Sequence, residues 1–188
     1  MKARKFLSSV ISGGQTGADR AALDAALERC FPAGGYCPKG RLAEDGPIPP
    51  RYPMEELSGG YRARTRKNIQ AADGTVVFYH REIEGGTALT VSIALKEKSP
   101  LKLIDTETVA AETAMELISA FCIQHEIGIL NVAGPRASKC ESIYGYVYVV
   151  VKRMLLAQAA SLDADSALGN DALTRNIPKN GQSAKCSH

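Results

Sequence analysis

Short apolar runs that end in glycine-rich turns constrain the fold of this chain more than any other feature. The run at 6–11 stops at Gly13-Gly14, the run at 75–79 precedes Gly85-Gly86, and the run at 128–132 ends in Ala133-Gly134-Pro135. After the turns, apolar residues recur at helical rather than alternating spacing. Apolar runs that alternate with helices indicate parallel strands, because a parallel neighbour can be reached only through a crossover connection.

We therefore predict an α/β fold, Rossmann-like and doubly wound, with a mainly parallel five-stranded sheet and helices on both faces. The stretch 38–60 is rich in proline and glycine and is predicted to be a long loop. The expected strands lie within 6–11, 34–37, 75–79, 101–104 and 128–132, and the expected helices follow Gly17 or lie within 64–72, 87–96, 108–127 and 142–160.

The length of 188 residues allows one domain with a substantial core. We expect a single ligand-binding domain over 1–160. Small and polar residues dominate 161–188, which predicts a loosely held C-terminal tail.

The last helix is apolar on more than one face. Ile143, Val147 and Val151 form one stripe, while Tyr144 and Tyr148 begin a second. Two apolar faces favour a homo-oligomer, and burial of both faces against the sheet is the alternative.

The loop Gly13-Gly14-Gln15-Thr16-Gly17 is the main candidate anion cradle. Glycines let backbone amides approach an anion, and the helix that follows presents unpaired N–H groups. The same residues have a purely structural interpretation, in which Thr16 caps the helix together with Asp19 as a capping box. The loop lacks the Lys-Ser/Thr pair of a nucleotide P-loop.

Two later turns repeat the arrangement. Gly85-Gly86 is followed by Thr87, which can cap its helix or bind a phosphate. Gly134 precedes Arg136, whose guanidinium can make a two-point contact with a phosphate or face solvent. Because ligands collect at the carboxyl ends of parallel strands, we expect these turns to share one site.

The segment 61–68 places four basic residues within six positions. Such a run is usually a solvated helix face. The alternative is that one or two of its cations, including Arg64, turn into the cleft while Thr65 and Asn68 supply neutral hydrogen bonds. In the long loop, Lys39 is a further candidate ligand contact, and the charges around it either form a lid or serve solubility.

Charge and cysteine content argue against several classes of protein. A net charge of +3 is mild for a nucleic-acid module, so the sequence disfavours a nucleic-acid partner. The five cysteines are scattered, without a paired CxxC or a secretory leader, which favours a reduced cytoplasmic setting and no structural metal. The longest apolar stretch, 143–151, is too short to span a membrane.

Taken together, five motifs resemble the molybdenum-cofactor carrier family, a circularly permuted branch of the SLOG superfamily. The resemblance extends over about 6–155 and rests on the segments 11–19, 35–41 with 43–46, 64–68, 85–87 and 133–136. Relatives of this branch include the Lonely Guy nucleotide hydrolases, also described as lysine decarboxylase-like proteins. The resemblance implies a Rossmann-like domain whose glycine loops bind molybdenum cofactor (molybdopterin) or a nucleotide.

The hydrolase relatives differ from this chain at one position that matters for catalysis. They carry a glutamate after the Gly-Gly-x-Gly-Thr motif, where this chain has Thr90, and Glu84 lies before the glycines. We therefore favour a binding or carrier protein for a phosphate-bearing small molecule. A nucleotide-processing enzyme such as a phosphoribohydrolase, with Asp19 or Glu84 as acid or base, is the alternative. Single-strand nucleic-acid binding through the basic segment ranks last.

Overall fold

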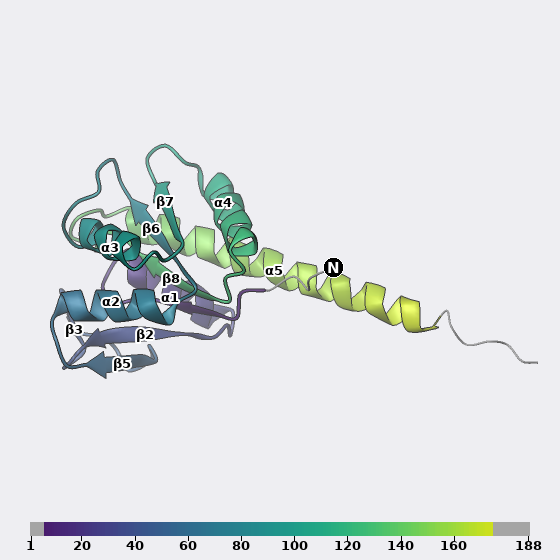
Figure 1. Ribbon diagram of the computed structural model, residues 1–188, viewed down its shortest axis with the longest axis horizontal. Helices are drawn as coiled ribbons and strands as arrows, with labels where there is room; N and C mark the ends of the chain where they lie inside the picture. Colours follow the sequence, from purple (N-terminus) through teal and green to yellow (C-terminus); the bar gives the residue numbers. More distant parts are fainter. Residues whose placement is uncertain (1–5, 175–188) are drawn as a thin grey trace, which may run out of the picture.

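The computed structural model describes residues 6–174, in which strands alternate with helices except between α1 and α2, where four strands follow one another (Figure 1). The strands are β1 Ser9–Ile11, β2 Ala33–Pro38, β3 Leu42–Ala43, β4 Gly46–Pro47, β5 Met54–Leu57, β6 Gly74–Tyr79, β7 Leu101–Asp105 and β8 Ile129–Ala133. The helices are α1 Ala18–Glu28, α2 Tyr61–Ala71, α3 Gly85–Lys96, α4 Ala111–Gln124 and α5 Ile143–Thr174.

Six strands form one parallel sheet in the order β5-β2-β1-β8-β6-β7. Helices α1, α4 and α5 pack together on one face, whereas α2 packs against α3 on the other (Figure 1). The predicted α/β, Rossmann-like, doubly wound fold is confirmed. β1, β8 and β6 lie in the middle of the sheet, so the turns that follow them open at its centre.

Helix α1 lies close to the sheet because its inner face is built from alanine. Ala18, Ala21, Ala22, Ala25 and Ala26 are fully buried. Alanine has the highest helix propensity and leaves room for close approach. The main hydrophobic core therefore fills the space between the sheet and α1, α4 and α5.

The predicted sheet had five strands, whereas the sheet in the structure has six. The stretch 38–60 was expected to be a loop, but it contains β5, which pairs with β2 at the sheet edge, and the small antiparallel β3–β4 ribbon. β5 reads Met-Glu-Glu-Leu, which carries no alternation of apolar and polar residues. Its place in the sheet comes from backbone pairing with β2, which a side-chain pattern does not reveal.

Helix α5 is longer than expected and ends at Thr174 rather than near 160. Its first apolar stripe, Ile143, Val147 and Val151, is buried in the core of the same chain. That stripe therefore packs internally, and only the second stripe, which begins with the partly exposed Tyr144, is open to a second copy. The homo-oligomer and the boundary at 160 stay predictions, and the tail beyond 174 lies outside the described residues.

Within residues 6–174, none of the helices combines the length and the apolar character that crossing a bilayer requires.

Candidate functional site

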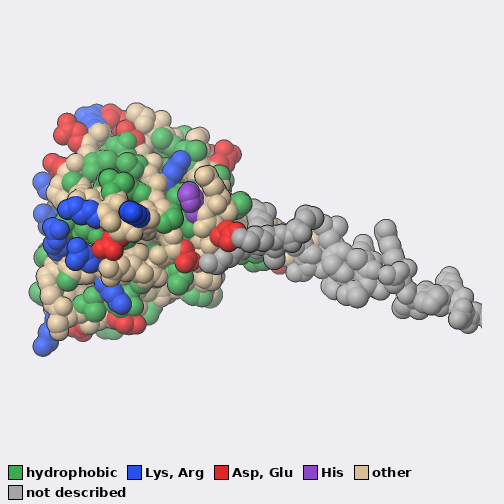
Figure 2. Space-filling view, in the orientation of Figure 1, with side chains coloured by type: hydrophobic (Ala, Val, Ile, Leu, Met, Phe, Trp, Pro, Cys, Tyr) green, Lys and Arg blue, Asp and Glu red, His purple; other side chains and the backbone are tan. Residues whose placement is uncertain are grey.

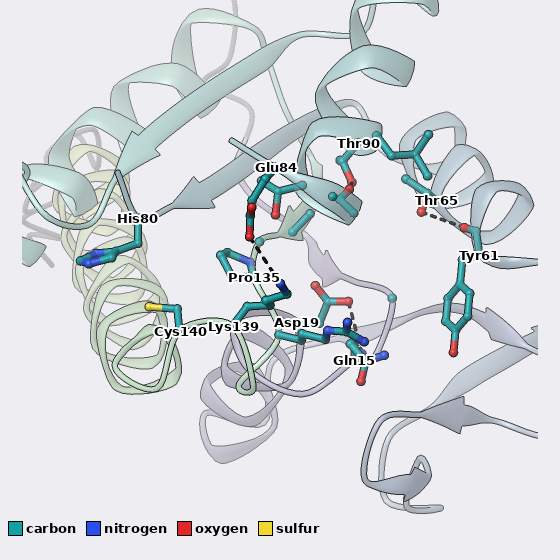
Figure 3. A pocket seen from close by; sticks show the side chains of 18 of the residues that line it. Gln15, Asp19, Tyr61, Thr65, His80, Glu84, Thr90, Pro135, Lys139 and Cys140 are labelled. Atoms are coloured by element: carbon teal, nitrogen blue, oxygen red, sulfur yellow. Dashed lines mark hydrogen bonds and ion pairs between the residues drawn. The ribbon is translucent and has the colours of Figure 1, made fainter. Parts of the chain in front are cut away.

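A cavity of about 700 Å³ opens at the carboxyl ends of the central strands (Figure 3). Its walls come from the turn after β1, the turn after β6, the turn after β8 and the inner face of α2. Because successive connections leave the sheet in different directions at this point, the turns part and leave a crevice. The volume lies in the range of small-molecule sites.

Most residues predicted from the sequence lie around this one cavity. Gly14, Thr16, Gly17 and Lys39 are the exceptions and do not line it. The predicted residues that line it are Gly13, Gln15, Asp19, Arg64, Thr65, Asn68, Gly85, Gly86, Thr87, Gly134 and Arg136. The structure therefore brings together all three glycine turns and the basic segment.

The first glycine loop uses its amides within the protein. The amide of Gly14 donates to Ser12 Oγ (3.3 Å), that of Gln15 to Asp19 Oδ2 (3.3 Å), and that of Thr16 to Gln15 Oε1 (3.0 Å). Amides that already have acceptors cannot also receive a phosphate without rearrangement. The amides of this loop are therefore engaged within the protein, and anion binding by the loop stays a prediction.

The capping box predicted for α1 is also absent. The N-cap residue is Gly17, and no side chain caps the helix. Thr16 instead donates its hydroxyl to Glu44 and accepts the Ala137 amide (3.1 Å). Thr16 thus joins the long loop to the turn after β8 and does not face the cavity.

Gly17 allows two loops to touch. A Cβ atom there would lie 2.4 Å from the Pro135 carbonyl oxygen and 2.8 Å from the Ala137 nitrogen. Its φ of +78° also lies in the region that favours glycine. Gly17 therefore positions the turn that carries Arg136, and it contributes to the site indirectly.

Asp19 is a buried carboxyl group on the cavity wall, with 6% of its surface exposed. Burial raises its pKa from the ordinary value of 3.8 to about 6. The charge of Arg64 and the amides of Gln15 and Gly13 oppose that rise. Asp19 therefore titrates near neutral pH inside the cavity.

Arg64 is the cation of the basic segment that turns inward. Its Nη1 donates to the Gly13 carbonyl oxygen (3.3 Å), and the guanidinium lies over the Tyr61 ring at 5.5 Å. Its Nε is buried and has no hydrogen-bond partner. A buried donor without an acceptor is unusual in proteins, and because Arg64 lines the cavity, this donor is a candidate ligand contact.

Two other cations of the segment, Arg66 and Lys67, lie on the protein surface. Arg66 pairs with Glu97 (3.2 Å), and Lys67 lies over the Tyr36 ring. Figure 2 shows Lys and Arg side chains gathered on the face that carries α2 and α3. The segment is therefore mainly a solvated helix face from which one arginine reaches the cavity.

Thr65 and Asn68 line the cavity, but their polar atoms have partners in the protein. Thr65 donates its hydroxyl to the Tyr61 carbonyl oxygen one turn earlier (2.9 Å). Asn68 accepts the Tyr36 amide (2.9 Å) and donates to the Tyr36 carbonyl oxygen (3.0 Å). Asn68 therefore fastens α2 to β2, which leaves less of its capacity for a ligand.

The second glycine turn is the more open one. No side chain caps α3, and a Cβ atom at Gly85 or Gly86 would meet nothing within 4 Å. The next amides, those of Thr87 and Ala88, already bond to the Glu84 carbonyl oxygen. The first amides of α3 thus remain accessible at the positive end of the helix dipole.

Cations surround the cavity mouth, each beside a carboxylate. Arg136 lies 3.4 Å from Glu44, and Lys139 lies 3.7 Å from Glu84. These cations are about half exposed, so each pair contributes little to stability and can exchange its partner for another anion.

Glu44 links the β3–β4 ribbon to the site. It accepts hydrogen bonds from the Ser138 amide (3.2 Å) and the Ser138 hydroxyl (2.5 Å), besides that from Thr16. Burial alone would raise its pKa, but these hydrogen bonds and the charge of Arg136 hold the pKa below its ordinary value. The ribbon is therefore held against the cavity edge by an ionised carboxylate.

Arg41 organises the rest of the long loop. Its guanidinium donates to four carbonyl oxygens, those of Ile48, Pro49, Tyr52 and Met54, at 2.8–3.3 Å. The side chains of Ile48, Tyr52 and Met54 form a small core with Leu23 and Cys37. Lys39 lies in the same loop, exposed and away from the cavity.

Replacing Arg41 by methionine is expected to destabilise the protein by about 2–4 kcal/mol, because several charge-assisted hydrogen bonds are lost while the aliphatic stem remains. Urea unfolding measures the change. Arg51→Met is the matched control from the same loop, where the guanidinium is 65% exposed and pairs with Asp24, and it should cost less than about 1 kcal/mol. Equal losses in the two variants would contradict this role for Arg41.

Sequence reasoning missed several residues of the cavity. Asn131 on β8 is buried and donates to Thr75 Oγ1 (3.2 Å), and His80, Lys139 and Cys140 lie further out on the wall. Asn131 was detectable as a polar residue inside an apolar strand. The others lie in turns whose path depends on contacts with distant segments.

In the part of the chain that the structure describes, no three His, Cys, Asp or Glu side chains gather closely enough to hold a metal ion. The expectation of no structural metal stays a prediction.

Comparisons with known proteins agree with this picture. The model of the circularly permutated YpsA SLOG family matches residues 10–155. The chain is also similar to a crystal structure from Syntrophus aciditrophicus SB of a protein provisionally named a molybdenum carrier protein, with 43% identity and a TM-score of 0.77 over 79% of this chain and 95% of the other. No curated protein matches the chain. The span 10–155 begins in β1 and ends in α5, so it contains every residue that lines the cavity.

Proposed function

This chain belongs to the circularly permutated YpsA SLOG family, and from that premise we propose that it binds a phosphate-bearing small ligand in the cavity and acts as its carrier. The family resemblance carried by the motifs is confirmed. The similarity to a protein named as a molybdenum carrier supports a ligand-binding role. The observation that carries the proposal is the cavity itself, where an open helix N-terminus, two rim cations and a buried unpaired arginine Nε converge.

We place the phosphate at the start of α3 rather than in the first glycine loop. The accessible amides of Gly85 and Gly86 and the helix dipole favour an anion there. Arg136 and Lys139 line the same cavity, and because both cations are about half exposed, they can exchange their carboxylate partners for the ligand. Thr87 is buried at this position and adds a hydroxyl donor.

Molybdenum cofactor and a nucleotide are the two ligands that the family suggests, and the donor set of the cavity fits both. Each carries a phosphate ester and a polar heterocycle, and 700 Å³ lies within the volume range of such ligands. The described residues offer no cluster of metal-binding side chains, so molybdenum would arrive on its organic dithiolene. When bound, the cofactor would supply its phosphate to the α3 turn, and the chain's own part is to hold and shield it.

Binding of pyrophosphate, followed by calorimetry, tests the anion site directly. The double variant Arg136→Ala, Lys139→Ala is expected to weaken binding by about 10- to 100-fold, because two charge-assisted contacts are lost. Arg66→Ala, Lys67→Ala removes the same charge from the outer face of α2 and should bind as wild type does.

An equal loss of pyrophosphate affinity in both double variants would mean that the anion responds to the net charge of the protein and does not bind in the cavity. The proposal would then fail. Mass spectrometry of small molecules released from freshly purified protein then identifies the natural ligand.

One observation favours a catalytic alternative. Asp19 is buried in the cavity with a pKa of about 6, as suits a general acid or base near neutral pH. Glu84, the other candidate, is exposed at the rim beside Lys139. Incubation with nucleoside monophosphates should release free base if the chain is a phosphoribohydrolase, and Asp19→Asn should abolish that release. Absence of released base rejects the enzyme.

A further inference from the structure

The polar groups of the cavity differ between its rim and its floor. The rim cations Arg136 and Lys139 are exposed, whereas Asp19 on the floor is more than nine-tenths buried. An ionised carboxylate repels a phosphate at short range in a protected site. The floor is therefore suited to the end of the ligand that does not carry the phosphate.

Asp19 retains acceptor capacity toward the cavity. A carboxylate offers about four acceptor positions. The backbone amides of Gln15 and Gly13 are the hydrogen-bond donors to it. Figure 3 shows the carboxylate between the first glycine loop and the cavity, with its bonded oxygen turned toward the loop. A ligand hydroxyl or N–H can thus bond to Asp19 without displacing either amide.

Arg64 supplies a donor next to this acceptor. Its buried Nε has no partner, while its Nη1 is held by the Gly13 carbonyl oxygen. A Cβ atom at Gly13 would lie 2.7 Å from Arg64 Cζ and 2.8 Å from Asp19 Oδ2, so both side chains border the space that glycine leaves. Arg64 lines the cavity, but its Nε has almost no accessible surface, so a ligand can bond to it only after the side chain shifts; with that shift, the floor offers one acceptor and one donor side by side.

We propose that Asp19 and Arg64 select the non-phosphate end of the ligand by pairing with a group that both donates and accepts hydrogen bonds. This inference rests on the proposed function and adds an orientation for the bound ligand. The phosphate lies at the start of α3, and the group that pairs with Asp19 and Arg64 lies at the first glycine loop. Two ligand parts have this chemistry. One is the N–H and C=O edge of a heterocycle, and the other is a sugar hydroxyl, which donates and accepts through the same oxygen.

Calorimetric titration of the full-length protein with pyrophosphate, ribose 5-phosphate and GMP tests this orientation of the ligand. In Asp19→Asn, the affinity for GMP or ribose 5-phosphate should fall by about tenfold or more, because a charge-assisted bond is lost. The affinity for pyrophosphate should stay unchanged or rise. A loss confined to GMP assigns the floor to the heterocycle edge, whereas an equal loss for ribose 5-phosphate assigns it to the sugar.

Two further variants keep the test decisive. Asp24→Asn makes the same change on the same helix, outside the cavity lining, and should leave all three affinities as in wild type. Arg64→Lys keeps the charge but loses the Nε donor, so it should weaken GMP or ribose 5-phosphate more than pyrophosphate. If Asp19→Asn does not fold, the affinities of Arg64→Lys for the three probes test the proposal instead.

The inference is overturned if Asp19→Asn weakens pyrophosphate by the same factor as the other two probes, or changes none of the three. It is also overturned if wild type binds GMP and ribose 5-phosphate no more tightly than pyrophosphate. Failure of wild type to bind pyrophosphate rejects the proposed function instead, so the two failures are distinguishable.

Discussion

Replacing Gly35 by alanine is expected to destabilise the protein by about 3–5 kcal/mol, a large share of the total stability of a typical domain. A Cβ atom at this position would lie 2.0 Å from the Ser12 carbonyl oxygen and 2.9 Å from the Ser12 nitrogen. These are backbone atoms, which cannot move aside without parting β2 from the end of β1. The φ of +134° adds strain for any residue other than glycine.

The matched control for this prediction is Gly46→Ala. Gly46 has a φ of +111°, but a Cβ atom there would meet nothing within 4 Å. This substitution isolates the backbone strain and should cost only about 1–2 kcal/mol. Urea unfolding of both variants separates strain from collision. Similar losses would show that the contact with Ser12 relaxes easily.

Replacing Asp19 by asparagine is expected to change how stability depends on pH. The folded protein holds the proton of Asp19 up to about pH 6, whereas the unfolded chain releases it near 3.8. A pKa that is raised on folding stabilises the protein below the unfolded value, and that stabilisation is lost as pH rises through the folded value. The difference between the two values corresponds to ~3 kcal/mol.

The asparagine side chain is nearly isosteric with the native aspartate and can still accept the Gln15 amide, but it carries no proton to lose. We therefore expect the free energy of unfolding of wild type to fall by ~3 kcal/mol relative to Asp19→Asn between about pH 3.5 and pH 6.5. Above that window the variant should be the more stable protein. Urea titrations at several pH values measure the difference, and two parallel curves would show that Asp19 is not desolvated.

The arrangement of strands and turns was predictable because it depends on local patterns. The periodicity of apolar residues along the chain distinguishes the strand at 75–79 from the helix at 87–96, and glycine pairs mark where one ends and the other begins. β5 was not predictable in this way, since two of its four residues are glutamates and only pairing with β2 makes it a strand. A backbone hydrogen bond to a distant strand leaves little trace in side-chain type.

Membership of the candidate site was also largely predictable, because parallel strands bring their carboxyl ends to one edge of the sheet. The roles within the site were not. Gly14 and Gly85 lie in similar motifs, yet the Gly14 amide bonds to Ser12 and the start of α3 remains open. Arg64 and Arg66 lie two residues apart, and only the first turns into the cavity.

What the sequence alone determined about this protein is therefore its alternation of strands and helices, its family and the set of turns that meet at the sheet edge. Only the tertiary structure decided which amides already have acceptors, which arginine turns into the cavity and which carboxylate is buried away from solvent. Periodicity and turn chemistry act over a few neighbouring residues, whereas the partner of a polar group and its exposure depend on segments brought together from across the chain.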